Sequence, residues 1–222
     1  MKQLTLIIPA KHESDSLPSV LEELKKFNVR KIIIIDKTDK KTKISIKKFN
    51  CKIINQKSKG YGSAIIEGIQ SVKTKYCCIF NADGSFNPND LNIMNKKIRS
   101  GYHFVFASRY LKGGSSDDDT LVTFLGNQIF SFIGKIFFKI KISDILFTFI
   151  AGHTTKFKNL SLSYNDFRLC VEVPIKIKKN KFSYTSFPSH ERRRIAGIKK
   201  VNAIKDGFLI MCALIKLYFK NV

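Results

Sequence analysis

The sequence is poor in acidic residues, with 17 Asp and Glu against 40 Lys and Arg, which gives a formal net charge of +23. A charge of this size produces a surface potential that attracts phosphates, nucleic acid or anionic lipid. Most basic residues are lysines, which occur beside many isoleucines and asparagines, and low-GC coding alone can generate that usage. The overall excess is therefore open to both interpretations. Arginine is scarce, so the run Arg192, Arg193 and Arg194 requires a local reason.

Other features are missing as well. The five cysteines form no CxxC pair and have no histidine at metal-finger spacing, which predicts a reduced protein on the cytosolic side without structural zinc. The apolar run before Lys11 is too short for a signal peptide. No uncharged apolar run reaches the roughly 18 to 20 residues that span a bilayer. Residues 121–134 and 207–215 come partway, which is typical of a buried helix or of one in the membrane interface.

Strand-like and helical patterns alternate along the first half of the chain. Short apolar or β-branched runs predict strands, and amphipathic segments predict the helices between them. The predicted strands are 4–9, 31–36, 51–55, 75–83 and 102–110, and the predicted helices are 14–27, 60–72 and 89–100. This order predicts an α/β fold with a Rossmann-like, mostly parallel sheet flanked by helices, and it places ligands at the carboxyl ends of the strands.

The second half of the chain has a different character. Residues 111–120, LKGGSSDDDT, form an acidic loop that is either a mobile lid or an exposed connection. Residues 121–141 predict a helix with one narrow polar stripe, and 201–219 predict a last helix with a similar apolar face. Such amphipathic helices either pack deeply or lie in the membrane interface. At 222 residues and 44% hydrophobic composition, the chain suits one domain, 1–222.

Carboxylates follow several predicted strands. Glu13, Asp36, Asp39 and Asp83 come at or near strand ends. A carboxylate there can accept hydrogen bonds from a ribose or base, or coordinate a divalent cation that neutralises a diphosphate. Each one alone is a weak signal, because an Asp after a strand is often a turn former or a helix cap.

The order of the motifs is more specific than any one of them. From residue 4 to residue 207, the chain shows IIPAKHES, IIIIDKTDKKT, KGYGSAIIEGI, FNADGSFNPNDL, FASRYLKGG and PSHERRRIAG. This series resembles the inverting family 2 glycosyltransferases of type-A fold, especially the branch with dolichyl-phosphate mannosyltransferase and the bacterial polyprenyl-phosphate glycosyltransferases. The resemblance implies a type-A glycosyltransferase fold. It also implies a nucleotide-sugar-binding half at 1–110 and an acceptor-side, membrane-facing half at 111–222.

The resemblance implies roles for residues around the nucleotide. Pro9 and Glu13 match the turn that holds the base, and Asp36 with Asp39 match an acidic pair, although Lys37 stands where the family usually has a second acid. Lys59, Gly60 and Gly62 match a turn in which the backbone approaches the nucleotide, because glycine has no side chain to block it.

The same resemblance assigns the metal and the reacting groups. Asp83 matches the second acid of the family's Asp-X-Asp motif, and Asn81 stands where the first acid usually is. Ser85 falls where some members place a further ligand for Mg²⁺ or Mn²⁺. Asn contributes no charge, so we expect weak metal affinity in the absence of nucleotide. Arg109 matches an arginine near the sugar and phosphates, and Glu172 loosely matches a family acid that serves as a general base.

The basic segment PSHERRRIAGIKK is open to two interpretations. Arg192 and Arg194 alternate along an extended chain, which suits binding of one phosphate by two guanidinium groups. The resemblance agrees, and it adds Lys200 near the donor or acceptor phosphate. The alternative is a solvated basic loop.

These residues together predict an enzyme that transfers a sugar from a UDP- or GDP-type donor to an acceptor. We expect the acceptor to be a polyprenyl phosphate, met by a peripheral protein on the anionic cytoplasmic face of a membrane; a glycan acceptor is the alternative. The chain lacks the arginine that the family often has shortly after the position of Asp144, which weakens the acceptor-phosphate match. A sugar-phosphate nucleotidyltransferase would normally show a glycine- and arginine-rich loop directly after the first strand, and IIPAKHES has none. A basic phosphate-binding or nucleic-acid-binding module is suggested by charge alone, and we expect no nucleic acid partner.

Overall fold

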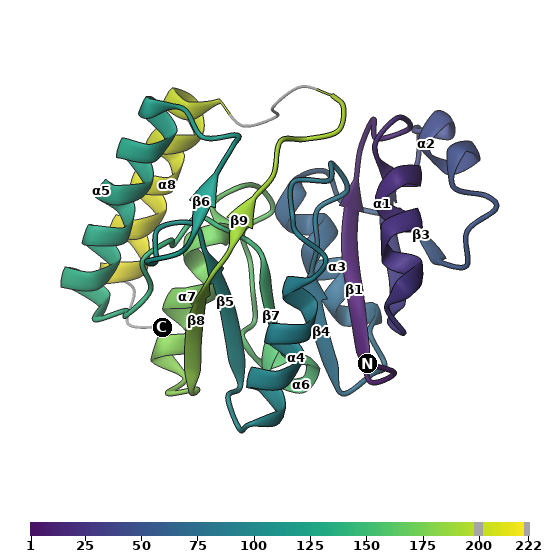
Figure 1. Cartoon of the computed structure of the whole chain (residues 1–222). Helices are drawn as coiled ribbons and strands as arrows, with labels where there is room; N and C mark the ends of the chain where they lie inside the picture. The colour runs from purple at the N-terminus through teal and green to yellow at the C-terminus, as the bar shows by residue number, and fades with distance from the viewer. Residues whose placement is uncertain (198–201, 220–222) are drawn as a thin grey trace.

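One seven-stranded sheet forms the centre of the molecule (Figure 1). The computed structural model describes residues 1–197 and 202–219. The strands of the sheet are β1 (Leu4–Ala10), β2 (Arg30–Asp36), β3 (Lys52–Gln56), β4 (Tyr76–Ile79), β5 (Phe104–Ser108), β7 (Ile150–His153) and β8 (Tyr184–Pro188). Their order is β3-β2-β1-β4-β7-β5-β8, and only β7 runs antiparallel to its neighbours, β4 and β5. The prediction of a mostly parallel sheet is confirmed.

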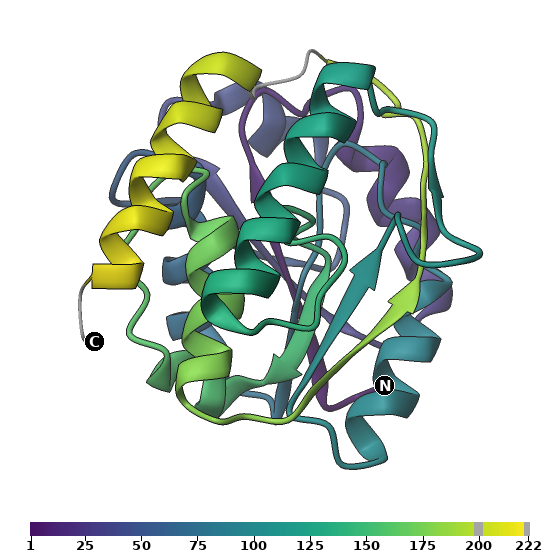
Figure 2. The ribbon, with the colours of Figure 1, turned by 90° about the vertical axis from the view of Figure 1, so that its left-hand side faces the viewer.

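Helices cover both faces of the sheet, as Figures 1 and 2 show. One face packs against α1 (Leu17–Glu23), the 3-10 turn η1 (Leu24–Lys26) and α4 (Asp90–Arg99). The other face packs against α3 (Tyr61–Ser71), α5 (Leu121–Phe138), α6 (Thr154–Asn159), α7 (Leu169–Lys179) and α8 (Ala203–Phe219). The short α2 (Lys40–Ser45) precedes β3, and β6 (Ser115–Ser116) pairs with β9 (His190–Glu191) in a separate ribbon.

The isoleucine-rich strands are buried on both sides. Side chains alternate along a strand, so Ile33 joins the core with α1 and α4 while Ile34 joins the core with α3, and both are fully buried. A strand between two helical layers needs no polar face. This explains why the run KIIIID is a central strand.

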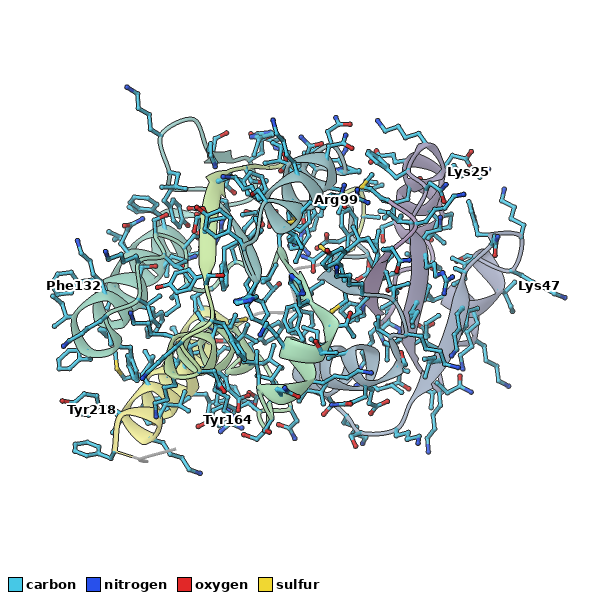
Figure 3. The ribbon with its side chains drawn as sticks, turned by 90° about the horizontal axis from the view of Figure 1, so that it is seen from below. Lys25, Lys47, Arg99, Phe132, Tyr164 and Tyr218 are labelled. Atoms are coloured by element: carbon cyan, nitrogen blue, oxygen red, sulfur yellow. The ribbon has the colours of Figure 1, made fainter. Side chains whose placement is uncertain are left out.

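The pair of α5 and α8 extends the second helical layer beyond the sheet, and the two helices lie side by side in Figure 2. Helix α5 begins with a capping box between Thr120 and Thr123. It is the one helix among the described residues that is long and apolar enough to cross a membrane, with 22% of that window buried. Large apolar side chains on both helices, including the labelled Phe132 and Tyr218 of Figure 3, are exposed.

Several elements have no counterpart among the predicted ones. The apolar segment 145–152 contains the start of β7, and α7 and β8 follow in a region without a clear periodic pattern. Both β7 and β8 belong to the second half of the chain, yet they complete the sheet that the first half begins. The division into a donor half and an acceptor half stays a prediction.

Candidate active site

A cavity of about 960 Å³ lies at the carboxyl ends of β1, β2, β4 and β5, on the upper side of Figure 1. In an open α/β sheet this is the edge at which ligands bind. The cavity receives most of the residues singled out from the sequence: Pro9, Glu13, Asp36, Lys59, Gly60, Asn81, Asp83, Ser85, Arg109 and Arg194. Residues separated by nearly the whole chain therefore meet around one space.

The turn after β4 is organised around Asp83. Its Oδ1 accepts hydrogen bonds from the Ser85 backbone N–H (3.0 Å) and hydroxyl (2.7 Å). Its Oδ2 lies 3.8 Å from Nη1 of Arg194, and its side chain is 16% exposed. Asn81 accepts from the Tyr61 hydroxyl at 3.4 Å. The turn thus holds three kinds of oxygen close together in sequence: the Asp83 carboxylate, the Asn81 amide oxygen and the Ser85 hydroxyl. The Arg194 guanidinium lies beside the carboxylate.

The two acids after β2 separate in space. Asp36 lines the cavity, and the Thr38 backbone N–H and hydroxyl donate to its Oδ1 and lower the pKa of Asp36. Asp39 does not line the cavity. It caps α2 by accepting from Thr42 N–H at 3.1 Å, and it accepts from His12 N–H at 2.7 Å. The structure therefore does not bring the predicted pair together at the cavity: Asp39 fixes the backbone of the loop after β1, where His12 has a left-handed φ of 56°. The nucleotide-binding role of the pair stays a prediction.

Arg109 reaches the cavity wall with its donors already occupied by carboxylates. Its Nε and Nη2 bond to the two oxygens of Asp144 at 2.8 and 2.9 Å, and Nη1 bonds to Glu191 at 3.0 Å. Burial alone would lower the pKa of Arg109, but these carboxylates raise it well above its ordinary value. The side chain ties β5 to the segment before β7 and to β9.

Arg194 and the acidic loop form a contact that the sequence did not indicate. Nη2 of Arg194 lies 2.9 Å from Oδ2 of Asp118, and Asp118 and Asp119 both line the cavity. Asp119 accepts a short hydrogen bond from the Tyr110 hydroxyl and lies 3.8 Å from Nη1 of Arg109. The loop 111–120 is therefore anchored over the site by arginines. The run of three aspartates is visible in the sequence, but Arg194, the partner of Asp118, lies 76 positions away.

The structure does not bring Arg192 to the cavity beside Arg194, and binding of one phosphate by both arginines stays a prediction. Its guanidinium pairs with Glu23 at 3.0 and 3.2 Å and donates to the Phe86 carbonyl at 3.0 Å, and the residue does not line the cavity. Its backbone N–H donates to the Ser85 carbonyl at 2.8 Å. Arg192 therefore braces the turn after β4 from outside, and Arg194 alone of the pair faces the cavity. Lys200 lies outside the described residues.

The structure does not bring Glu172, the predicted general base, to the cavity, and its catalytic role stays a prediction. It is fully buried in α7, and its carboxylate accepts from Ser163 N–H, the Ser163 hydroxyl and Tyr164 N–H at 2.7 to 3.0 Å. Lys176 lies 2.9 Å away, and Glu172 does not line the cavity. With its oxygens so engaged, the carboxylate holds the loop before α7.

The glycines before α3 serve that same loop. Gly60 has a φ of 110°, and a Cβ on it would lie 2.0 Å from the Asn165 carbonyl oxygen. A Cβ on Gly62 would lie 2.3 Å from the Tyr164 carbonyl oxygen. Close packing of the 164–166 backbone thus already requires glycine at both positions, and the approach of a nucleotide to this turn stays a prediction.

The far wall of the cavity comes from α5 and α8 and is mostly apolar, although Thr123, Asn127 and Asp206 also line it. The apolar residues and glycines there are Val122, Gly126, Phe130, Ala203, Ile204, Gly207 and Ile210. Gly126 has open space where a side chain would stand. The polar turn at Asp83 and a groove between two apolar helices are therefore parts of one cavity.

Comparison with known proteins agrees with this geometry. Residues 5–161 match the model of the family described as Glycosyl transferase family 2. The chain is 25% identical to a UDP-N-acetylglucosamine–dolichyl-phosphate N-acetylglucosaminyltransferase of Methanococcus voltae, over 100% of this chain and 98% of that protein. It is 25% identical to a dolichol-phosphate mannosyltransferase of Pyrococcus furiosus, over 86% of this chain and 58% of that protein. For several such relatives the chain spans little more than half their length.

The fold also has solved counterparts. A crystal structure of glucosyl-3-phosphoglycerate synthase from Mycobacterium tuberculosis, in complex with Mn²⁺, UDP and glucosyl-3-phosphoglycerate, superposes with a TM-score of 0.76 at 11% identity, over 97% of this chain and 79% of that chain. At this identity the likeness shows the fold alone, and it confirms the predicted type-A glycosyltransferase fold. The chain belongs to glycosyl transferase family 2 and is a nucleotide-sugar-dependent glycosyltransferase.

Proposed function

We propose that this enzyme transfers a sugar from a nucleotide-diphosphate sugar to a polyprenyl phosphate at the cytoplasmic surface of a membrane. The observation that carries the proposal is the continuity of the cavity, which joins the Asp83 turn to the apolar groove between α5 and α8. A polar end suits a charged donor, and an apolar end suits the hydrocarbon of a lipid acceptor. The two substrates would then meet near Asp83.

The donor end offers groups for each part of a nucleotide sugar. Glu13 and Asp36 are acceptors for hydrogen bonds from a base or ribose, and Pro9 supplies an apolar surface beside them. Lys59 and Arg194 are cationic side chains in the cavity wall, and each can donate charge-assisted hydrogen bonds to the oxygens of a diphosphate. Because Arg194 is paired with Asp118, donor binding has to compete for it.

The turn after β4 fits a divalent cation. Asp83, Asn81 and Ser85 bring only oxygen donors, which Mg²⁺ and Mn²⁺ prefer. Within residues 1–197 and 202–219, no cluster of three or more His, Cys, Asp or Glu side chains is placed to hold a metal alone. The turn therefore suits an ion shared with the substrate diphosphate. A bound ion there supplies charge neutralisation for the leaving diphosphate.

A phosphate acceptor also agrees with the position of Glu172, which lies outside the cavity. A phosphate monoester carries between one and two negative charges near pH 7, so its oxygen needs no general base to become a nucleophile. A sugar hydroxyl would need one, and Glu172 is bound to Ser163, Tyr164 and Lys176. Attack from the face opposite the leaving diphosphate would invert the anomeric carbon.

The outer side of α5 and α8 supports a membrane location. Its exposed apolar residues are Leu121, Phe124, Leu125, Ile129, Phe132, Ile136 and Phe137 on α5, and Phe208, Ile215, Tyr218 and Phe219 on α8. We call this set the α5–α8 face. Apolar surfaces of this extent on soluble proteins mark contacts with partners or lipid. Lys135 and Lys139 are exposed beside the face, as headgroup-level lysines are, and the net charge of +23 favours anionic lipid.

A transfer assay tests the proposal. The protein is incubated with Mn²⁺, undecaprenyl phosphate in detergent and each of a panel of labelled UDP- and GDP-sugars, and organic extraction collects lipid-linked product. We expect one donor to label the lipid fraction, with none formed by Asp83→Ala. Labelling of a glycan or of a soluble phosphorylated acceptor, with none of the lipid, would replace the proposed acceptor and keep the glycosyltransferase.

Flotation tests the membrane part separately. We expect the protein to float with phosphatidylglycerol vesicles, and Phe132→Ser with Ile136→Ser to reduce the floated fraction severalfold. The matched control is Ile44→Ser with Ile93→Ser, which also removes two exposed apolar side chains but lies outside the face. Equal loss in both double variants would contradict a specific lipid-contacting face.

A further inference from the structure

A second cavity, of about 520 Å³, lies at the opposite edge of the sheet, where β1, β2 and β3 begin. Figure 3 views the molecule from this side. Its charged lining residues are all basic: Lys2, Arg30, Lys31, Lys52 and Lys73. Asn28, Asn50, Thr5 and Ser71 add polar side chains. We call this space the amino-edge cavity.

Strand register places the basic residues together. Arg30 begins β2 and pairs with Thr5 of β1, and Lys52 begins β3 and pairs with Ile32 of β2. Alternation along β2 directs Arg30 and Lys31 to opposite faces of the sheet, so the cavity reaches around its edge. Lys73 comes just after α3 ends. Four separate segments thus deliver cations to one space.

These cations have no carboxylate partners. Among residues 1–197 and 202–219, none of the five forms an ion pair with Asp or Glu, and no acidic residue lines the cavity. By contrast, Arg109, Arg192 and Arg194 are all paired. Like charges held close repel one another, and a multiply charged anion removes that repulsion.

We propose that the amino-edge cavity binds a soluble ligand through a phosphate or diphosphate group. Its volume lies within the range of small-molecule sites. Lysine and arginine beside neutral amides and hydroxyls are the groups that bind phosphate oxygens. The site is separate from the donor cavity, since the two share no residue and lie at opposite ends of the strands.

Position favours a soluble ligand over a lipid headgroup. The cavity lies among β1, β2 and β3, on one side of the sheet order, whereas α5 and α8 lie toward β8 on the other side (Figure 1). A flat membrane against the α5–α8 face would not also reach the amino-edge cavity. This inference does not depend on the identity of the acceptor.

Cys51 offers a readout confined to the cavity. It lines the space and is half-buried, whereas Cys212 on α8 is exposed and lies far along the chain from it. We would measure the labelling rates of both thiols with a methanethiosulfonate reagent by peptide mass spectrometry, with pyrophosphate or with NaCl of equal ionic strength. We expect pyrophosphate to slow labelling of Cys51 and to leave Cys212 unchanged. Binding of pyrophosphate in the donor cavity would not affect this readout.

Two double variants of equal charge change complete the test. Arg30→Ser with Lys52→Ser removes two cavity cations and should raise the pyrophosphate concentration for half protection about tenfold or more. Lys47→Ser with Lys96→Ser removes two exposed lysines outside both cavities and should leave it unchanged. Circular dichroism and thermal melts check that both variants fold.

Three results would overturn the proposal. The first is Cys51 labelling that does not respond to pyrophosphate in the wild type. The second is equal loss of protection in both double variants, which would show an effect of net charge alone. The third is protection by phosphatidylglycerol vesicles without protection by pyrophosphate, which would make the ligand a lipid headgroup.

Discussion

The two edges of the sheet treat positive charge in opposite ways. At the carboxyl edge, Arg109 and Arg194 are bound to carboxylates, and the acidic residues that line either cavity are found there. At the amino edge, five basic side chains line a cavity without an acid. The chain has 17 acidic and 40 basic residues, and the acidic residues are not spread evenly between the two edges. Acids outnumber bases around the carboxyl-edge cavity, where seven Asp or Glu and four Lys or Arg side chains line the space, so that a diphosphate bound there would call for an additional cation or for exchange of an arginine partner.

The largest effect should come from removing the carboxylate of the turn after β4. We expect Asp83→Asn to lower the transfer rate by at least about a hundredfold, because the carboxylate is the only charged oxygen donor in that turn. Initial rates with saturating donor and Mn²⁺ measure it. Ser85→Ala is the companion variant, and it should cost less because it removes a hydrogen bond to Asp83 and no charge. Near-normal activity of Asp83→Asn would show that the metal site lies elsewhere.

Filling the groove between α5 and α8 should affect the proposed lipid acceptor and leave the nucleotide-sugar donor unaffected. Gly126→Leu places a side chain in the open space of the α5–α8 groove without a clash at Cβ, and leucine favours a helix more than glycine does. We expect lipid-linked product to fall tenfold or more while slow hydrolysis of the nucleotide sugar is unchanged. Gly126→Ala is the matched control and should transfer normally. Equal loss of transfer and hydrolysis in Gly126→Leu would mean that the groove does not hold the acceptor.

Charge balance at the carboxyl edge can be shifted through Arg194. Its guanidinium lies 3.8 Å from Asp83, where it repels a second cation. Arg194→Gln should therefore tighten Mn²⁺ binding by the nucleotide-free protein severalfold and should raise KM for the donor, which loses a phosphate partner. Mn²⁺ titration followed by electron paramagnetic resonance, together with steady-state kinetics, measures both. If Mn²⁺ binding weakens, the arginine is not a competitor of the ion.

The smallest expected effect concerns the fold beside the site. Asp39 caps α2 and accepts from His12, and although burial opposes it, hydrogen bonds from Thr42 and His12 lower the pKa of Asp39 below its ordinary 3.8. Because the folded-state pKa is the lower one, this stabilisation is present above pH 3.8 and is lost as the pH falls through the folded value. Asp39→Ala should reduce the free energy of unfolding by about 1 kcal/mol at pH 7. Urea unfolding measures it, and the difference from wild type should shrink below pH 3.8.

Sequence reasoning recovered the features that depend on local pattern. The strands up to β5, the helices between them other than α2, and the turns that carry Asp36 and Asp83 follow from periodicity and from the known edge at which α/β sheets bind ligands. Alternation along the extended basic segment singled out Arg194, and the family resemblance agreed with it. Each of these rests on residues close together in the chain or on a topology rule.

The features that the sequence did not indicate depend on pairing over long separations. Arg192 was expected beside Arg194, but it pairs with Glu23, 169 positions away, because the strand pairing of β8 and the β9 ribbon bring it to α1. Glu172 is a plausible acid by motif, and only the position of Ser163 and Lys176 shows that its oxygens are taken. The amino-edge cavity was also not expected, since its basic residues come from four segments with no shared motif.

The reversed direction of β7 has a consequence for how the site is assembled. A parallel strand delivers only its outgoing turn to the carboxyl edge, whereas β7, being antiparallel to β4 and β5, delivers its incoming segment there. In that segment, Asp144 accepts a hydrogen bond from Arg109, and Phe147 lines the cavity. Thr148 also lines the cavity and forms a hydrogen bond with the Tyr61 hydroxyl. The reversal of one strand therefore brings a further stretch of chain to the edge at which β1, β2, β4 and β5 end, and that stretch is fixed there by its contacts with Arg109 and Tyr61.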